Sequence, residues 1–210
     1  MNHLIMLRIL LVGAVLSFPV LLAAQDKGKT DEPDDRTRLG AHAPEQVVDA
    51  IPPDVPEVKL KLTSDAFRDG EVIPVRHSCE GDDLSPPLSW SNVPEGTRAF
   101  ALICEDPDAP VGTWDHWVIF NLPGEMTSLP EGITGESGLG EGVGHGLNSW
   151  QRTGYGGPCP PPGKPHRYFF RLCALSARVD LSDGATKKEL LEAIKPLTLG
   201  HTELMGTFSR

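Results

Sequence analysis

The chain has 210 residues and a formal net charge of −10 at pH 7. A nucleic-acid partner needs a basic face that neutralises phosphates, so this charge argues against one. It also argues against general adhesion to anionic lipid, although a locally positive pocket for a small anion is compatible with it.

The N-terminal segment predicts export. Residues 1–24 carry a basic residue, Arg8, before an apolar run, which is typical of a secretory signal peptide. The run is shorter than the roughly 20 apolar residues of a bilayer span. Leu22 occupies the third position before a cut after Ala24, where a small residue is preferred, so a retained N-terminal anchor is the alternative. We expect a periplasmic or secreted protein.

The next segment has a different composition. Residues 25–57 are rich in charge and proline and contain few core-forming side chains. Such a segment is typical of an acidic, disordered linker. The remaining residues, 58–210, are enough for one stable globular domain.

The first half of this domain predicts short strands at 58–62, 72–75, 99–104 and 118–122. Leu88 and Trp90 form a period-two apolar pair, and residues 91–98 predict a hairpin-type turn. We interpret His77 as a solvated loop histidine. Closely spaced strands without a long amphipathic helix indicate an all-β sandwich or barrel.

The second half begins with a glycine-rich stretch within residues 127–148, which predicts a mobile surface loop. A strong strand follows at 166–175, with His166 and Tyr168 on the same face. Thr186 begins a capping box that predicts a short amphipathic helix. A last strand is expected at 203–208.

Six polar side chains make up the candidate site: Asp106, Asp108, Asp115, His116, His166 and Tyr168. The first four lie between two predicted strands, and the last two begin a later strand. Aspartates and histidines can bind a metal that activates water, as in a hydrolase, but no spacing here matches a recognised ligand set.

A second function class is a small-anion binding protein. Histidine N–H groups, a tyrosine hydroxyl and the backbone of a glycine-rich wall are suitable donors. A carboxylate fits such a pocket if it is protonated, orients a histidine or pairs with a ligand ammonium group. A third class is a structural or inhibitory protein whose loop is a surface for a partner.

Several motifs resemble the phosphatidylethanolamine-binding protein family. They are DPDAP at 106–110, WDHW at 114–117 and HRY at 166–168. Two others, LSPPLSW at 84–90 and GYGGPCPP at 154–161, resemble its bacterial and archaeal branch, the Raf-kinase-inhibitor-like proteins. The resemblance covers the whole predicted domain.

The resemblance implies a mainly β fold, a Greek-key β-sandwich with a few short helices. It also implies a shallow pocket for phosphate-type anions at one end. The family's pocket residues match Asp106, Pro110, Trp114, His116, His166 and Tyr168. The family has binding and inhibitory roles rather than a settled catalytic one, so we expect no enzymatic activity and no cofactor.

The four cysteines permit three disulfide pairings in an oxidising compartment. On regular strands Cys104 and Cys173 point to opposite faces and cannot bridge. The resemblance places the loops of Cys79 and Cys159 near the pocket end. We therefore hypothesise a Cys79–Cys159 disulfide, with the other two cysteines free and buried.

Together these observations predict an exported small-molecule binding protein for phosphate or a phospholipid head group, with an inhibitory or regulatory role. The alternatives are a metal-assisted phosphoester hydrolase and an inhibitor of a secreted hydrolase. A protein partner and a homodimer are left open.

Overall fold

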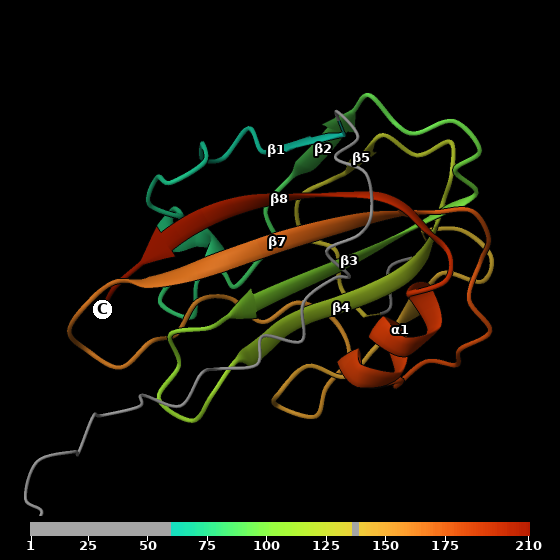
Figure 1. Ribbon diagram of the computed structural model, residues 1–210. Coiled ribbons are helices and arrows are strands. Elements are labelled where there is room, and N and C mark those ends of the chain that lie inside the picture. Colours follow the sequence, from blue (N-terminus) through green and yellow to red (C-terminus); the bar gives the residue numbers. More distant parts are fainter. Residues whose placement is uncertain (1–59, 136–138) are drawn as a thin grey trace, which may run out of the picture. The chain divides into compact units, whose positions relative to one another are not determined.

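The computed structural model of the protein describes residues 60–135 and 139–210. The predicted signal peptide and linker lie outside these residues. The described chain forms two antiparallel sheets and one α-helix (Figure 1). The predicted mainly β fold class is therefore confirmed.

The larger sheet has five strands in the order β6-β4-β3-β7-β8, and Figure 1 shows its four long strands side by side. In that order they are β6 (Gly144–His145), β4 (Trp114–Pro123), β3 (Ala99–Asp106), β7 (His166–Leu175) and β8 (Thr198–Phe208). The smaller sheet has the order β1-β2-β5, with β1 (Lys61–Thr63), β2 (Leu88–Ser91) and β5 (Ser128–Leu129).

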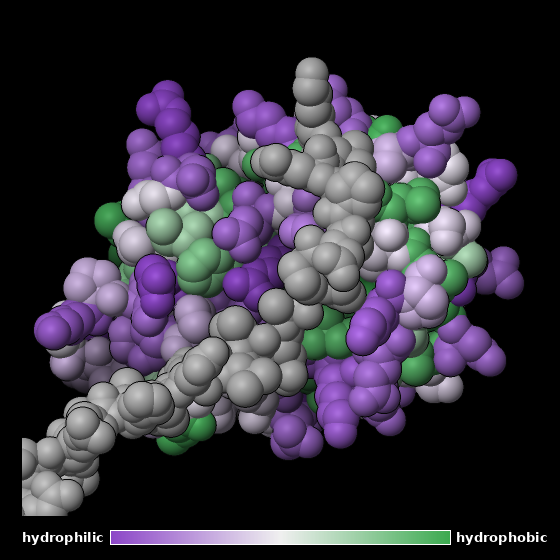
Figure 2. Space-filling model, in the orientation of Figure 1, coloured by the Kyte–Doolittle hydropathy of each residue, from purple (hydrophilic) through white to green (hydrophobic). Residues whose placement is uncertain are grey.

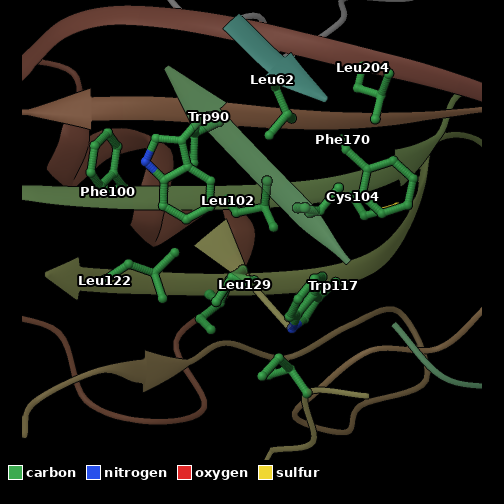
Figure 3. Close-up of a cluster of buried hydrophobic side chains, with 14 of the residues drawn as sticks. Leu62, Trp90, Phe100, Leu102, Cys104, Trp117, Leu122, Leu129, Phe170 and Leu204 are labelled. Carbon is green, nitrogen blue, oxygen red and sulfur yellow. The ribbon is translucent and has the colours of Figure 1, made fainter. Parts of the chain in front are cut away.

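The main core fills the space between the two sheets. Figure 3 shows side chains of both sheets meeting there, among them Leu62, Trp90, Leu129, Phe100, Leu102, Trp117 and Phe170. Trp90 is 4% exposed and belongs to this core.

A second core lies on the opposite face of the larger sheet, under helix α1 (Lys187–Ile194). Leu190 and Ile194 of this helix are buried in the same cluster as Val118 and Phe120 of β4. Because β3 is covered on both faces, all its residues are buried. This explains why its sequence is a continuous apolar run rather than an alternating one.

Two strong sequence predictions are confirmed. The strand expected at 166–175 coincides with β7. The capping box is also present: the Thr186 hydroxyl accepts from the Glu189 N–H, and the Glu189 carboxylate accepts from the Thr186 N–H.

Two local predictions in the first half are wrong. Residues 72–75 form no strand: Val72 makes one parallel bridge to Thr207, and a short 3-10 helix, η1 (Val75–His77), follows Pro74. Proline has no N–H for a strand ladder, so pairing stops there. Residues 91–98 do not close a hairpin, because they connect β2 of the smaller sheet to β3 of the larger one.

Two further predictions need correction. The end of the glycine-rich stretch is packed rather than a mobile surface loop, since Gly144 and His145 form β6 against β4. A Cβ at Gly144 would clash with the Phe120 ring, so only glycine permits this approach. His77 is 2% exposed rather than solvated, because residues 75–84 fold around it and its Nδ1 lies 2.9 Å from the Leu84 carbonyl oxygen.

The face shown in Figure 2 is covered mainly by hydrophilic side chains, with smaller hydrophobic areas between them. Within residues 60–135 and 139–210, no helix is both long and apolar enough to span a bilayer.

Candidate functional site

Three strand ends meet at one end of the larger sheet. Strand β3 ends at Asp106, while β4 begins at Trp114 and β7 begins at His166. These strands are direct neighbours, so their terminal side chains gather in space. They line a pocket of about 250 Å³ whose walls are Asp106, Ala109, Pro110, Val111, Trp114, His116, Trp150, Cys159, Pro160, Pro161 and His166. Five of the six predicted binding residues lie on these walls.

A β-bulge presents His116 to the pocket. Cys104 and Glu105 are adjacent on β3, but their partners on β4 are Trp117 and Asp115, so His116 is an extra residue. As a result, His116 and Trp117 are both buried on the side of the smaller sheet, whereas regular strand neighbours point to opposite faces. Bulges re-aim side chains in this way next to binding sites.

The His116 ring is fixed by contacts on several sides. Its Nδ1 lies 2.6 Å from the Gly156 carbonyl oxygen, and its ring packs edge-on against Tyr168 and Trp150. A carbonyl only accepts, so Nδ1 carries the proton and the neutral ring has its lone pair on Nε2. Burial lowers the pKa of His116, which favours this neutral form.

Asp106 orients the second histidine. Its Oδ2 accepts from His166 Nδ1–H at 2.8 Å, and its Oδ1 accepts from the Asp108 N–H at 2.8 Å. Asp106 is 3% exposed, and both carboxylate oxygens are engaged by the protein. Of the three roles considered for a carboxylate here, the geometry supports the one that orients a histidine.

Asp108 shapes the loop between β3 and β4. Its carboxylate accepts from the backbone N–H, Nε and Nη2 of Arg167 at 2.7–3.0 Å. The hydrogen bonds and the positive charge of Arg167 lower the pKa of Asp108. This carboxylate therefore ties the loop to the start of β7 and does not line the pocket.

Tyr168 lies behind His116 and is fully buried. Its ring centroid is 5.1 Å from that of His116, and its buried hydroxyl interacts with the Asp106 carboxylate. Burial and the nearby charge of Asp106 raise the pKa of Tyr168. Tyr168 therefore supports the His116 ring.

Comparison with known proteins identifies the family. Residues 63–209 match the family model described as phosphatidylethanolamine-binding protein. The chain belongs to the phosphatidylethanolamine-binding protein family. The resemblance inferred from the motifs is therefore confirmed.

Relatives and solved structures of this family match a large share of the chain. A UPF0098 protein of Methanothermobacter thermautotrophicus is 47% identical over 151 residues, which are 72% of this chain and 99% of the relative. A phosphatidylethanolamine-binding protein homologue from Chlamydia trachomatis is 40% identical, with a TM-score of 0.66, over 72% of this chain and 97% of the other. Escherichia coli YbcL, described as a member of the mammalian PEBP family, is 33% identical, with a TM-score of 0.68, over 72% and 98%.

In this member of the phosphatidylethanolamine-binding protein family, one pocket wall comes from residues that the sequence did not assign. Cys159, Pro160 and Pro161 form part of it, and Cys159 is joined to Cys79 by a disulfide with a Cα separation of 5.4 Å. The GYGGPCPP motif marked this segment without indicating which side chains face the pocket. Trp150 gave no signal, because its sequence neighbours carry no motif.

The remaining cysteines are free and buried on different faces of the larger sheet. Cys104 belongs to the core between the sheets, and Cys173 to the core under α1. In the described part of the chain, no three His, Cys, Asp or Glu side chains come together as a metal-ligand set. This arrangement offers no support to the metal-assisted hydrolase alternative.

Proposed function

We propose that the protein is an exported binding protein whose pocket holds phosphate or a phosphorylated head group. One observation carries the proposal: the imidazoles of His116 on β4 and His166 on β7, the two strands that flank β3, line the same pocket of about 250 Å³. Each ring has its Nδ1 engaged by a protein acceptor, which leaves Nε2 as the nitrogen through which the ring binds a ligand.

The neutral His116 ring favours an anion that carries a proton. A neutral ring offers a lone pair at Nε2. A phosphate with a proton suits this ring, because its O–H can donate to His116 Nε2. His166, which is oriented by the Asp106 carboxylate, lines the same pocket.

The other walls favour an ester over a bare anion. Pro110, Val111, Trp114 and Trp150 present apolar surface beside the two imidazoles. Small-molecule pockets commonly combine such walls with a few polar groups that fix the ligand. A phosphate monoester with a small organic group, such as phosphoethanolamine, fits this combination.

Isothermal titration calorimetry tests the proposal. Inorganic phosphate and phosphoethanolamine are expected to bind at pH 7, and sulfate, which has no proton to donate, more weakly. Loss of the hydrogen bond from the phosphate O–H to Nε2 in His116→Ala is expected to weaken phosphate binding by about tenfold. His201→Ala, which removes a half-buried histidine on β8 outside the pocket, is the matched control. Absence of binding for both phosphate ligands would refute the proposal.

Two further measurements address export and catalysis. Cell fractionation of the full chain and of a variant lacking residues 1–24 tests export, since only the full chain is expected outside the cytoplasm. A phosphoesterase screen with added divalent metals tests the hydrolase alternative. Turnover that disappears in His166→Ala would show that the protein is a hydrolase rather than a binding protein.

A further inference from the structure

Two carboxylates face each other on the sheet surface that lies behind the pocket. Glu105 of β3 and Asp115 of β4 are register partners, and each directly precedes a residue of the pocket wall, Asp106 or His116. The Glu105 and Asp115 side chains are only 6% and 19% exposed. Like charges directly opposite each other destabilise a strand pair, so this pairing needs a cation.

Lys187, the first residue of α1, supplies that cation. Its Nζ lies 3.1 Å from Glu105 Oε2 and 2.6 Å from Asp115 Oδ1, and its side chain is 12% exposed. Burial by itself lowers the pKa of Lys187, but the charges of the two carboxylates outweigh it and raise the pKa. Arg171 of β7 adds a second positive charge, 2.6 Å from Glu105 Oε1.

The Glu105–Asp115 pair borders the bulge that aims His116. On one side of the bulge Trp117 pairs with Cys104, and on the other Asp115 pairs with Glu105. If the two carboxylates separate, β4 can slip by one residue and place His116 opposite Glu105. A slip of one residue turns a side chain to the other face of the sheet. The His116 ring would then leave the pocket for the side of α1.

We propose that Lys187 is a positioning residue for the pocket: by bridging Glu105 and Asp115 it holds the bulge that presents His116. The inference rests on the proposed anion-binding function, because it assigns Lys187 to that site without contact with the ligand. It differs from a purely structural role, in which Lys187 would only dock α1 on the sheet.

Three single variants separate these roles. Lys187→Met keeps the length of the side chain and removes the charge, while Lys187→Arg keeps the charge. Lys188→Met is the matched control, because Lys188 is the next residue of the same helix and is exposed. The readouts are the affinity for inorganic phosphate by calorimetry and the His116 ring signals by NMR of the ligand-free protein.

Lys187→Met is expected to weaken phosphate binding by about tenfold, the lower end of the effect that partners of metal-ligating residues have on affinity, and to shift the His116 ring signals. Lys187→Arg is expected to retain both properties, and Lys188→Met to change neither. Loss of stability in Lys187→Met with unchanged affinity and unchanged His116 signals would overturn the inference.

A neutral triple variant covers the case in which Lys187→Met does not fold. Glu105→Gln/Asp115→Asn/Lys187→Met removes the repulsion and the charge of Lys187 and leaves Arg171 its ion pair with Glu203, so it is expected to recover the native His116 signals and phosphate affinity. Displaced His116 signals in this folded variant would count against the charge argument. If the unmodified protein does not bind phosphate, the proposed function fails, whereas the NMR comparison still decides whether Lys187 positions His116.

Discussion

Removing the Cys79–Cys159 disulfide is expected to destabilise the protein strongly. The bridge joins residues 80 positions apart, and a cross-link of this span lowers the entropy of the unfolded chain by about 15 cal/mol/K, or about 4.5 kcal/mol at 25 °C. For a domain of this size, that corresponds to a melting temperature lower by about 9–18 °C.

The native state contributes little to this loss, because other contacts keep the two loops together. The Cys79 N–H donates to the Pro158 carbonyl, and the Gly157 N–H donates to Asp83 Oδ1. The effect should therefore act mainly through the unfolded chain, and the fold should survive at 25 °C.

Urea unfolding followed by tryptophan fluorescence measures the loss in Cys79→Ser/Cys159→Ser. The unmodified protein under a dithiol reductant should match this variant, and the variant itself should not respond to the reductant, because Cys104 and Cys173 are buried and unpaired. A difference of less than about 1 kcal/mol between variant and oxidised protein would refute the loop-entropy argument.

Three other perturbations test separate parts of the structure. Tyr168→Phe is expected to change phosphate affinity less than about twofold by calorimetry, because the hydroxyl is fully buried and Tyr168 does not line the pocket; a large loss would place it in the ligand shell. Burial lowers the pKa of His145 in the folded protein. Below about pH 6.5 the unfolded chain therefore binds more protons than the folded one, and the free energy of unfolding falls by up to about 1.4 kcal/mol per pH unit. Urea titrations of His145→Leu should show a shallower fall. Thr186→Ala removes the helix cap and should cost about 1 kcal/mol in the same assay, with Lys188→Ala as a neutral comparison.

The sequence predicted best the features that depend on one segment at a time. The length and alternation of β7 and the capping box at Thr186 were read from local patterns and are present. The sequence placed His166 at the start of a strand, as the structure does, but it assigned Asp106 and Trp114 to a loop, whereas β3 extends to Asp106 and β4 begins at Trp114. Asp106, Trp114 and His166 lie at these strand ends, and this alone brings them to one edge of the sheet.

Features that depend on a second segment were not predictable in this way. His77 looks like a loop histidine in the sequence, yet η1 and the following turn enclose it. Trp150 reaches the pocket because the chain after β6 folds back to place its ring against His116. The role of Asp106 became defined only when both of its oxygens had identified partners, His166 and Asp108.

The alternation of side chains along a strand predicted one feature correctly and another wrongly. It separated Cys104 from Cys173 correctly, because the stretch of β3 and β7 between them pairs without a register shift. The same rule places His116 and Trp117 on opposite faces, whereas the bulge turns both toward the smaller sheet.

The pattern at residues 114–117 contains nothing that forces a bulge. What holds the bulge lies elsewhere in the chain: Lys187 binds Asp115 on one face, while Tyr168 and Trp150 pack against His116 on the other. A register irregularity of this kind is stable only if both faces favour it, since each face alone could be satisfied by rotating or shifting the strand. The position of His116, and with it the polar centre of the pocket, is therefore a property of several segments together, including the one that holds the ring through the Gly156 carbonyl, and it becomes visible only when all of them are in place.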